Sequence, residues 1–123
     1  VGMLKDTVHT TELDTVYMAG IEAMKALDYK RAVTILRPYD DYNSALAFMS
    51  ADYNHSALDV LGRLDDKDPK VCYLMAMVLI RLEQYDEARK YFDLCLAYDP
   101  YMRHRANLDP EMHKLVSTSN NNF

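Results

Sequence analysis

Few residues of this chain have the types and spacing that catalysis requires. Its four histidines, His9, His55, His104 and His113, include no pair at the i, i+4 spacing of a helical metal site. Two cysteines supply too few ligands for a zinc site. The sequence also lacks a glycine-rich phosphate loop, a G-x-S-x-G motif and an H-E-x-x-H motif. We therefore expect no enzymatic activity, no metal and no cofactor.

Charged residues cluster at a few places. The acids at 40–41 and at 65–68 lack the spaced oxygen ligands and the turn glycine of a calcium loop, so we expect turns and helix caps there. Residues 103–105 (Arg-His-Arg) with Lys114 form the only local basic cluster, which could receive a carboxylate or phosphate or pair with neighbouring acids. A net charge of −5 and a pI near 5.2 argue against nucleic-acid binding.

Three pairs of small residues organise the elements that must position any site. The members of each pair stand 12 positions apart: Gly20 and Ala32, Ala45 and Ala57, Ala76 and Ala88. This spacing predicts two antiparallel helices that touch where neither carries a large side chain. One helical hairpin is therefore predicted three times, and each copy buries its apolar face against its neighbours.

Larger side chains repeat in the same register. A tyrosine precedes the first small residue by three positions, an aliphatic residue follows it by one, and Met or Ile follows it by four. These columns are Tyr17, Tyr42 and Tyr73, then Ile21, Leu46 and Met77, then Met24, Met49 and Ile80. No stretch alternates with period two for long enough to form a sheet, so the fold class is predicted to be all-α.

The best-preserved copy runs from Asp68-Pro69 to Asp99-Pro100 and resembles a tetratricopeptide repeat (TPR). In that family a small residue in the first helix, a tyrosine and an alanine opening the second, a large apolar residue one turn later and a closing proline recur. The corresponding residues here are Ala76, Tyr85, Ala88, Phe92 and Pro100, and in the first copy Gly20, Tyr29, Ala32 and Leu36. The resemblance spans about residues 13–105.

The spacing departs from the family period of about 34 residues. Ala32 and Ala57 are 25 residues apart, and Ala57 and Ala88 are 31 apart. Pro38 disfavours a helical residue before it, so we expect the second helix of the first hairpin to end there.

The resemblance implies a right-handed α-α superhelix of about three TPR-like hairpins plus a short C-terminal capping helix. We expect a flexible lead-in over 1–11, a single domain over 12–117 and a disordered tail over 118–123. The hairpins are expected at about 12–37, 41–64 and 69–97, with the capping segment at 100–117.

The resemblance also implies a binding surface, because the first helices of TPR hairpins line a concave groove that receives a protein or peptide. The positions carried over are Tyr17, Ile21, Met24, Lys25, Tyr42, Leu46, Met49, Tyr73, Met77 and Arg81, with Lys25 and Arg81 at the edge. Tyrosine and methionine offer large apolar area and adaptable contacts. The alternative is that these side chains are core, covered by a terminal helix carrying Met112, Leu115 and Val116.

Two further expectations follow from the family register. Family members that grip an acidic chain terminus use a Lys and Asn clamp, and this chain has tyrosine and aliphatic residues at those places. Cys72 and Cys95 face each other on one hairpin, so they form either a disulfide or a pair of buried thiols.

The leading functional hypothesis is a non-catalytic TPR module for protein–protein or peptide binding within a larger cell-envelope protein. The tail at 101–111 loosely resembles the ends of TPR tails on Bacteroides-type envelope proteins, which favours the periplasm or envelope over the cytoplasm. The alternatives are a structural or homo-oligomerisation module or spacer, and an enzyme-accessory domain. The chain starts at Val1 without a leader and is expected to be a fragment. Its longest uncharged apolar run, Val71 to Ile80, is ten residues, so no transmembrane segment is expected in it.

Overall fold

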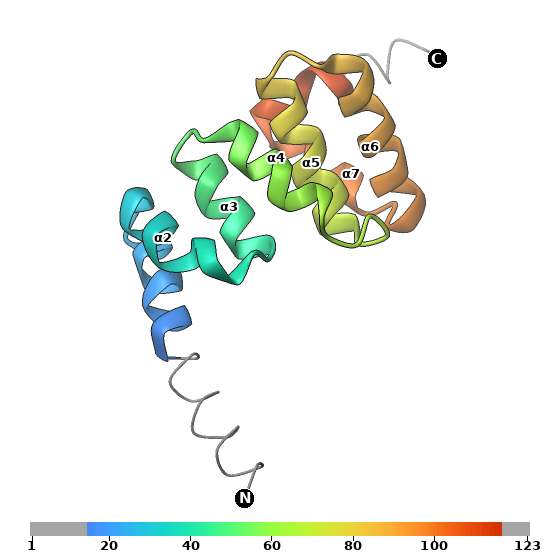
Figure 1. The fold of residues 1–123 in the computed structure, drawn as a ribbon. Helices are drawn as coiled ribbons and strands as arrows, with labels where there is room; N and C mark the ends of the chain where they lie inside the picture. Colours follow the sequence, from blue (N-terminus) through green and yellow to red (C-terminus); the bar gives the residue numbers. More distant parts are fainter. Residues whose placement is uncertain (1–14, 117–123) are drawn as a thin grey trace, which may run out of the picture.

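The computed structural model describes residues 15–116, and within that range the chain is built from helices with no strand. The first helix covers described residues 15–25. It is followed by α2 (Tyr29–Leu36), η1 (Arg37–Tyr39), α3 (Tyr42–Ser50), α4 (Asn54–Gly62), α5 (Pro69–Arg81), α6 (Tyr85–Tyr98), α7 (Met102–Leu108) and η2 (Pro110–Met112). Successive hairpins lie side by side (Figure 1). The predicted all-α helical-repeat fold is confirmed. The expected lead-in over 1–11 and tail over 118–123 lie outside the described residues.

The two helices of each hairpin are joined by the same type of turn. Leu27, Asp52 and Glu83 adopt the left-handed conformation, with φ of 62°, 69° and 61°. The N–H of the following residue donates to a carbonyl five positions back, at 2.9 Å, 2.8 Å and 2.8 Å between N and O: Asp28 to Ala23, Tyr53 to Phe48, and Gln84 to Leu79. These bonds form the Schellman motif, which satisfies the last carbonyls of a helix. The same local geometry therefore begins each second helix.

The shortened first hairpin is explained by its proline. α2 has 8 residues, whereas α6 has 14. The chain continues from Leu36 as the 3-10 helix η1, which contains Pro38, and Asp40 then turns it with φ of 52°. Asp41 caps α3 through a capping box with Ser44. The prediction that the second α-helix ends before Pro38 is confirmed, but its steric reason is wrong, because Arg37 keeps helical angles with φ of −56° and ψ of −37°. Pro38 ends the α-helix because it has no N–H to donate.

Small residues stand where helices meet. Ala32, Ala45, Ala57, Ala76 and Ala88 are all fully buried. Gly20 is even more constrained, because a Cβ added there would lie 2.5 Å from Cδ2 of Leu36. The small-residue register predicted from the sequence is therefore the packing register of the hairpins.

Helix α5 forms the centre of the core. Every residue from Val71 to Leu79 is buried, because α5 packs against α3, α4, α6 and η2. Such a helix is apolar on all sides. Its start is fixed by Asp68, whose carboxylate accepts the N–H of Lys70 at 2.9 Å, and by Pro69 in the first turn.

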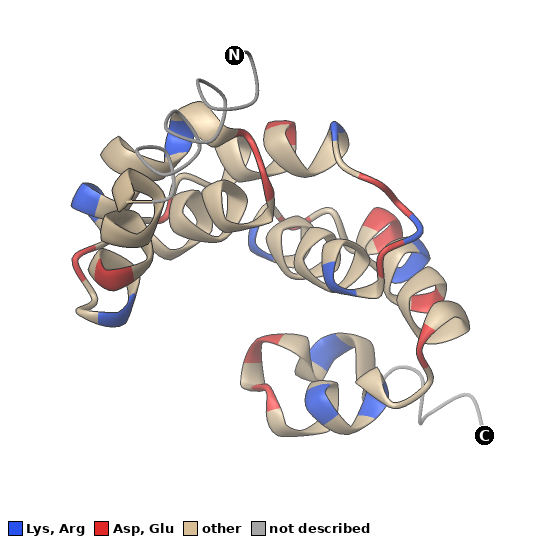
Figure 2. Cartoon of the chain, turned by 90° about the horizontal axis from the view of Figure 1, so that it is seen from below, with Lys and Arg blue, Asp and Glu red and all other residues tan. Residues whose placement is uncertain are grey.

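Residues 102–116, named here the C-terminal segment, comprise α7, η2 and the helical residues 113–116. The hairpins follow a curve, and this segment lies on its inner side (Figure 2). Met112, Leu115 and Val116 are buried there, and the guanidinium of Arg89 donates to the carbonyl of Leu115 at 2.7 Å. The segment therefore packs into the core of the third hairpin.

Candidate functional site

The predicted tyrosine and aliphatic columns divide into an open part and a covered part. Six of their side chains are partly exposed and pack on the core at the same time. One is Ile80 of α5. The other five belong to the first helix and to α3, and we name them the inner surface: Tyr17, Ile21, Met24, Tyr42 and Leu46. Their spacing of i, i+4 and i+7 on the first helix, and of i, i+4 on α3, places each row on one helix face.

Tyr17 is fixed by contacts between the first helix and the start of α3. Its hydroxyl donates to Oδ2 of Asp41 at 2.7 Å and accepts from Nδ2 of Asn43 at 2.6 Å. Its ring meets that of Tyr39 edge to face, with 4.8 Å between centroids. Burial raises the pKa of Tyr17, and the bond from Asn43 opposes that rise. The ring is therefore held in one orientation before any partner binds.

Tyr42 has two cationic neighbours. The Lys70 ammonium is 5.3 Å from the centre of its ring. Burial raises the pKa of the Tyr42 hydroxyl, while Arg105 of the C-terminal segment lowers it. Tyr42 thus stays a neutral aromatic side chain with one cation near its ring and another near its hydroxyl.

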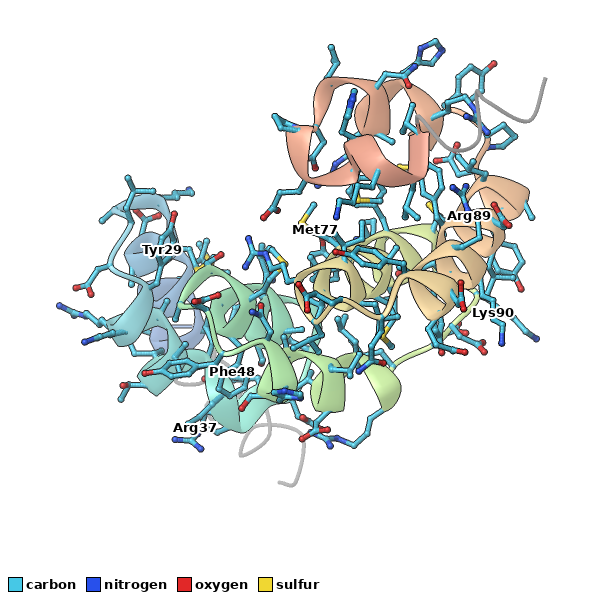
Figure 3. All side chains as sticks on the ribbon, turned by 90° about the horizontal axis from the view of Figure 1, so that it is seen from above. Tyr29, Arg37, Phe48, Met77, Arg89 and Lys90 are labelled. Atoms are coloured by element: carbon cyan, nitrogen blue, oxygen red, sulfur yellow. The ribbon has the colours of Figure 1, made fainter. Side chains whose placement is uncertain are left out.

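The third-hairpin columns are covered, contrary to the expected open groove. Tyr73 is only 1% exposed and Met77 only 5%. The Tyr73 hydroxyl donates to Oδ2 of Asp109 at 3.0 Å, and the Arg105 guanidinium lies 4.6 Å from the ring centre. Burial raises the pKa of Tyr73, and Asp109 raises it further. For this hairpin, the alternative of a core filled by the C-terminal segment is the one that the geometry supports; Met77 faces that segment in Figure 3.

Arg81 and Met49 also differ from the expected groove residues. Met49 is buried, and its carbonyl accepts from Nη1 of Arg81 at 2.7 Å. Nε of Arg81 donates to Glu111 at 2.9 Å, so the guanidinium ties α3 to the C-terminal segment. Arg81 is therefore a structural link and not an open groove edge. Lys25 is exposed and pairs with Glu22 at 3.3 Å.

The cysteines are two free, fully buried thiols and not a disulfide. Sγ of Cys72 donates to the carbonyl of Asp66 at 2.9 Å. Burial raises the pKa of Cys72 and raises that of Cys95 to about 11. Both side chains act as small apolar residues of the core.

The remaining chemical motifs are dispersed. The basic cluster at 103–105 does not gather with Lys114, because Arg105 covers Tyr73 and Lys114 covers the ring of Tyr85 at 4.4 Å. Across residues 15–116, no three side chains of His, Cys, Asp or Glu are grouped as metal ligands. Each helix in that range is too short or too polar to cross a membrane.

Sequence reasoning missed the polar partners of the tyrosines. Asp109 precedes Pro110 and caps η2 by accepting the N–H of Glu111 at 3.1 Å. Its other oxygen accepts the Tyr73 hydroxyl across 36 residues. No local signal predicts that pairing. Asp41 and Asn43, the partners of Tyr17, left a weak signal in the sequence, because they flank Tyr42 of the same column.

Comparison with known proteins gives a family match for the third hairpin. A family model described as tetratricopeptide repeat matches residues 69–101, which include the whole of α5 and α6. No curated protein and no solved structure matches the chain. The first two hairpins share the left-handed turn and the buried small residues of the matched one.

Proposed function

We propose that the chain is a non-catalytic module that binds a peptide or protein through its inner surface, starting from the match of its third hairpin to the tetratricopeptide repeat family. Repeats of this family serve protein interaction, which supports a protein partner. The partner would contact the inner surface of the first helix and α3. The third hairpin would support that surface and reach the partner only through Lys70, beside Tyr42.

The observation that carries the proposal is the half-buried state of the inner-surface side chains. Tyr17 and Tyr42 pack on the core with one side and remain partly exposed on the other. Binding costs less conformational entropy when aromatic anchors are already ordered. Tyrosine is also a common residue at binding hot spots, because it combines a large apolar ring with a polar end.

The spacing of the surface indicates the shape of the partner. Tyr17, Ile21 and Met24 form one row on the first helix, and Tyr42 and Leu46 form a second row on α3. Two rows at helical spacing suit a partner helix whose apolar residues recur at i, i+3, i+4 and i+7. Arg105 and Lys70 beside Tyr42 favour an acidic residue at the end of that helix.

The test is selection of helical peptides from a random displayed library against the folded domain. The selected peptides are then titrated against Tyr42→Ser and Ile21→Ser by calorimetry. Truncating a hot-spot residue is expected to weaken binding at least tenfold. Tyr98→Ser is the matched control, because Tyr98 ends α6 and is 45% exposed. Circular dichroism checks that each variant is folded.

Two outcomes would contradict the proposal. Peptides that bind Tyr42→Ser and Ile21→Ser as well as the parent chain would show that the inner surface is not used. Peptides lost with Tyr98→Ser would instead place the contact on the second helices.

The C-terminal segment provides a second check on which columns are open. A chain ending at Leu108 loses the bond of Asp109 to Tyr73 and the pair of Glu111 with Arg81. We expect it to be less stable and to bind more hydrophobic dye, because Tyr73 and Met77 become exposed. Unchanged stability and dye binding would mean that the segment does not cover them in solution.

A structural or homo-oligomeric role is the second candidate, and exposed apolar side chains at both ends of the curve favour it. Val16 and Met18 on the first helix are 50% and 49% exposed, and Tyr101 and Leu108 are 78% and 86% exposed. Self-association through these residues predicts a molar mass in light scattering that rises with protein concentration. Leu108→Lys should abolish that rise, whereas a monomer at every concentration would exclude the role.

We also propose that the chain belongs to a larger cell-envelope protein. The support is the resemblance of residues 101–111 to the ends of envelope-protein TPR tails. Fractionation of cells that express the native gene tests it: recovery with the envelope is expected, and recovery in the cytoplasm would contradict it.

A further inference from the structure

A hollow opens on the outer side of the first two hairpins, between the second helices α2 and α4. Its volume is about 400 Å³. Phe48 of α3 forms its floor, and Arg37 and Phe48 lie together on this side of the molecule, away from Met77 and the C-terminal segment (Figure 3). We name it the outer hollow; it is distinct from the inner surface, which lies on the first helices.

The outer hollow lies where α2 and α4 are not packed together. α2 makes almost no direct contact with α4, and Phe48 of α3 lines the gap between them with 9% of its surface exposed. Asp52, with φ of 69°, places Tyr53 at the N-cap of α4 with its ring edge on Phe48, 6.5 Å between centroids. Tyr53 is 48% exposed, so the hollow has an aromatic wall as well as an aromatic floor.

The charge of the outer hollow is opposite to that of the chain. Its charged lining residues are Lys30 and Arg37, both exposed, and no carboxylate is among its described lining residues. The whole chain carries 19 acidic and 14 basic residues. Lys30 and Arg37 have no ion pair within the part of the chain that the structure describes. Two cations at a partly apolar hollow favour a negatively charged ligand.

A smaller hollow of about 250 Å³ lies beside the outer hollow, and its charges indicate how the ligand would be oriented. It shares Arg37, Phe48 and Ser56 with the larger one and continues toward Asp40, Asp59 and Arg63. Asp40 is held by a two-point contact with Arg63, and this contact lowers the pKa of Asp40. Asp59 adds negative charge at the far end. An acidic ligand is therefore drawn to the Lys30 end and repelled from the Asp59 end.

We propose that the outer hollow binds an acidic peptide segment that carries one large apolar side chain. The apolar side chain contacts Phe48 and Tyr53, and carboxylates on either side of it contact Lys30 and Arg37. The hydroxyls of Thr34 and Ser56 also line the hollow. The Thr34 hydroxyl donates to the carbonyl of Lys30 at 3.1 Å, so it can accept from a peptide N–H, and the Ser56 hydroxyl can bond to the peptide backbone. The site faces away from the inner surface, so it engages a second segment or a second partner.

The experiment titrates isotope-labelled protein with one synthetic peptide, acetyl-Glu-Asp-Ser-Glu-Phe-Glu-Ser-Asp-amide, and follows the backbone amides by NMR. The largest shifts are expected at Phe48, Tyr53 and Ser56. A second peptide with Lys at each acidic position is the charge control and should cause no saturable shift. Affinity should fall with added salt, because exposed charges are screened.

Charge-reversal variants locate the contact. Lys30→Glu and Arg37→Glu should each weaken the acidic peptide about fivefold or more, since losing a surface ion pair accounts for up to that factor and reversal adds repulsion. Arg31→Glu is the matched control: Arg31 is an exposed cation on the same helix but does not line the hollow. Tyr42→Ser on the inner surface should leave the affinity unchanged.

The proposal is overturned by any of three results. These are no saturable binding of the acidic peptide at millimolar concentration, equal weakening by Arg31→Glu and Arg37→Glu, or shifts confined to amides of the first helix and the start of α3. The last result would show that the acidic peptide binds the inner surface instead, and it would leave the proposed function standing.

Discussion

Replacing Gly20 by alanine tests the close contact between the first helix and α2. A Cβ on Gly20 would lie 2.5 Å from Cδ2 and 2.6 Å from Cγ of Leu36, and 3.0 Å from Cγ2 of Ile35. Leu36 is fully buried, and its Cγ is a branch point, so the side chain cannot simply swing away. Overpacking of this kind costs about 1–3 kcal/mol. Alanine gains about 1 kcal/mol over glycine in a helix, which leaves a net destabilisation of about 1 kcal/mol.

Gly62→Ala is the matched control and should have the opposite sign. Gly62 ends α4, and a Cβ there would have no neighbour within 4 Å. Its φ is not positive, so alanine fits the backbone and lowers the entropy of the unfolded chain. Stabilisation of about 0.5–1 kcal/mol is expected. Urea unfolding followed by circular dichroism measures both changes at one temperature.

A double-mutant cycle then attributes the cost to Leu36. In a Leu36→Ala background, the two closest atoms are gone, so the penalty of Gly20→Ala should largely disappear. The coupling between the two positions is expected to be about 1 kcal/mol or more. If Gly20→Ala stabilises the parent chain as Gly62→Ala does, the close approach of the first helix and α2 is absent and the hairpin register is wrong.

Three further changes test other parts of the fold. Leu27→Gly should stabilise by about 1 kcal/mol in urea unfolding, because Leu27 is 69% exposed and has φ of 62°, a region costly for residues with a Cβ; a loss of stability would exclude the left-handed turn. Ala88→Leu should cost about 1–3 kcal/mol and exposed Ala97→Leu far less; equal costs in thermal unfolding would contradict the helix contact. Burial raises the pKa of Cys72, and that of Cys95 to about 11. Unfolded thiols titrate near pH ~8.5, so stability should be complete below that pH and fall as the pH rises toward 11. Cys95→Ala should flatten this decline, and rapid alkylation of both thiols in the folded protein would show that they are not buried.

The fold was predictable because its signals are local and repeat. Gly20 and Ala32, and the later pairs, mark helix contacts through residue size alone. Pro38 marks the end of α2 because it has no N–H to donate to a helical hydrogen bond. Asp68 and Pro69 mark the start of α5 by capping chemistry. Each signal involves residues close in sequence, and each agrees with the others, which is typical of repeat proteins.

The candidate site was less predictable because exposure depends on which segment covers which face. Tyr17, Tyr42 and Tyr73 hold the same register, yet Tyr73 is fully buried and the other two are partly exposed. The difference arises from Asp109 and Arg105, which lie more than 30 residues after Tyr73 in the chain. Such pairings leave no trace in the repeat pattern, so the sequence could offer the open groove and the filled core only as alternatives.

The short first hairpin positions the inner surface. Pro38 ends α2 after 8 residues, and η1 then turns the chain into Asp41, which accepts the Tyr17 hydroxyl. A second helix that continued past Leu36 would move Asp41 away from Tyr17. Lengthening α2 should therefore release the Tyr17 ring and weaken binding of a partner at the inner surface.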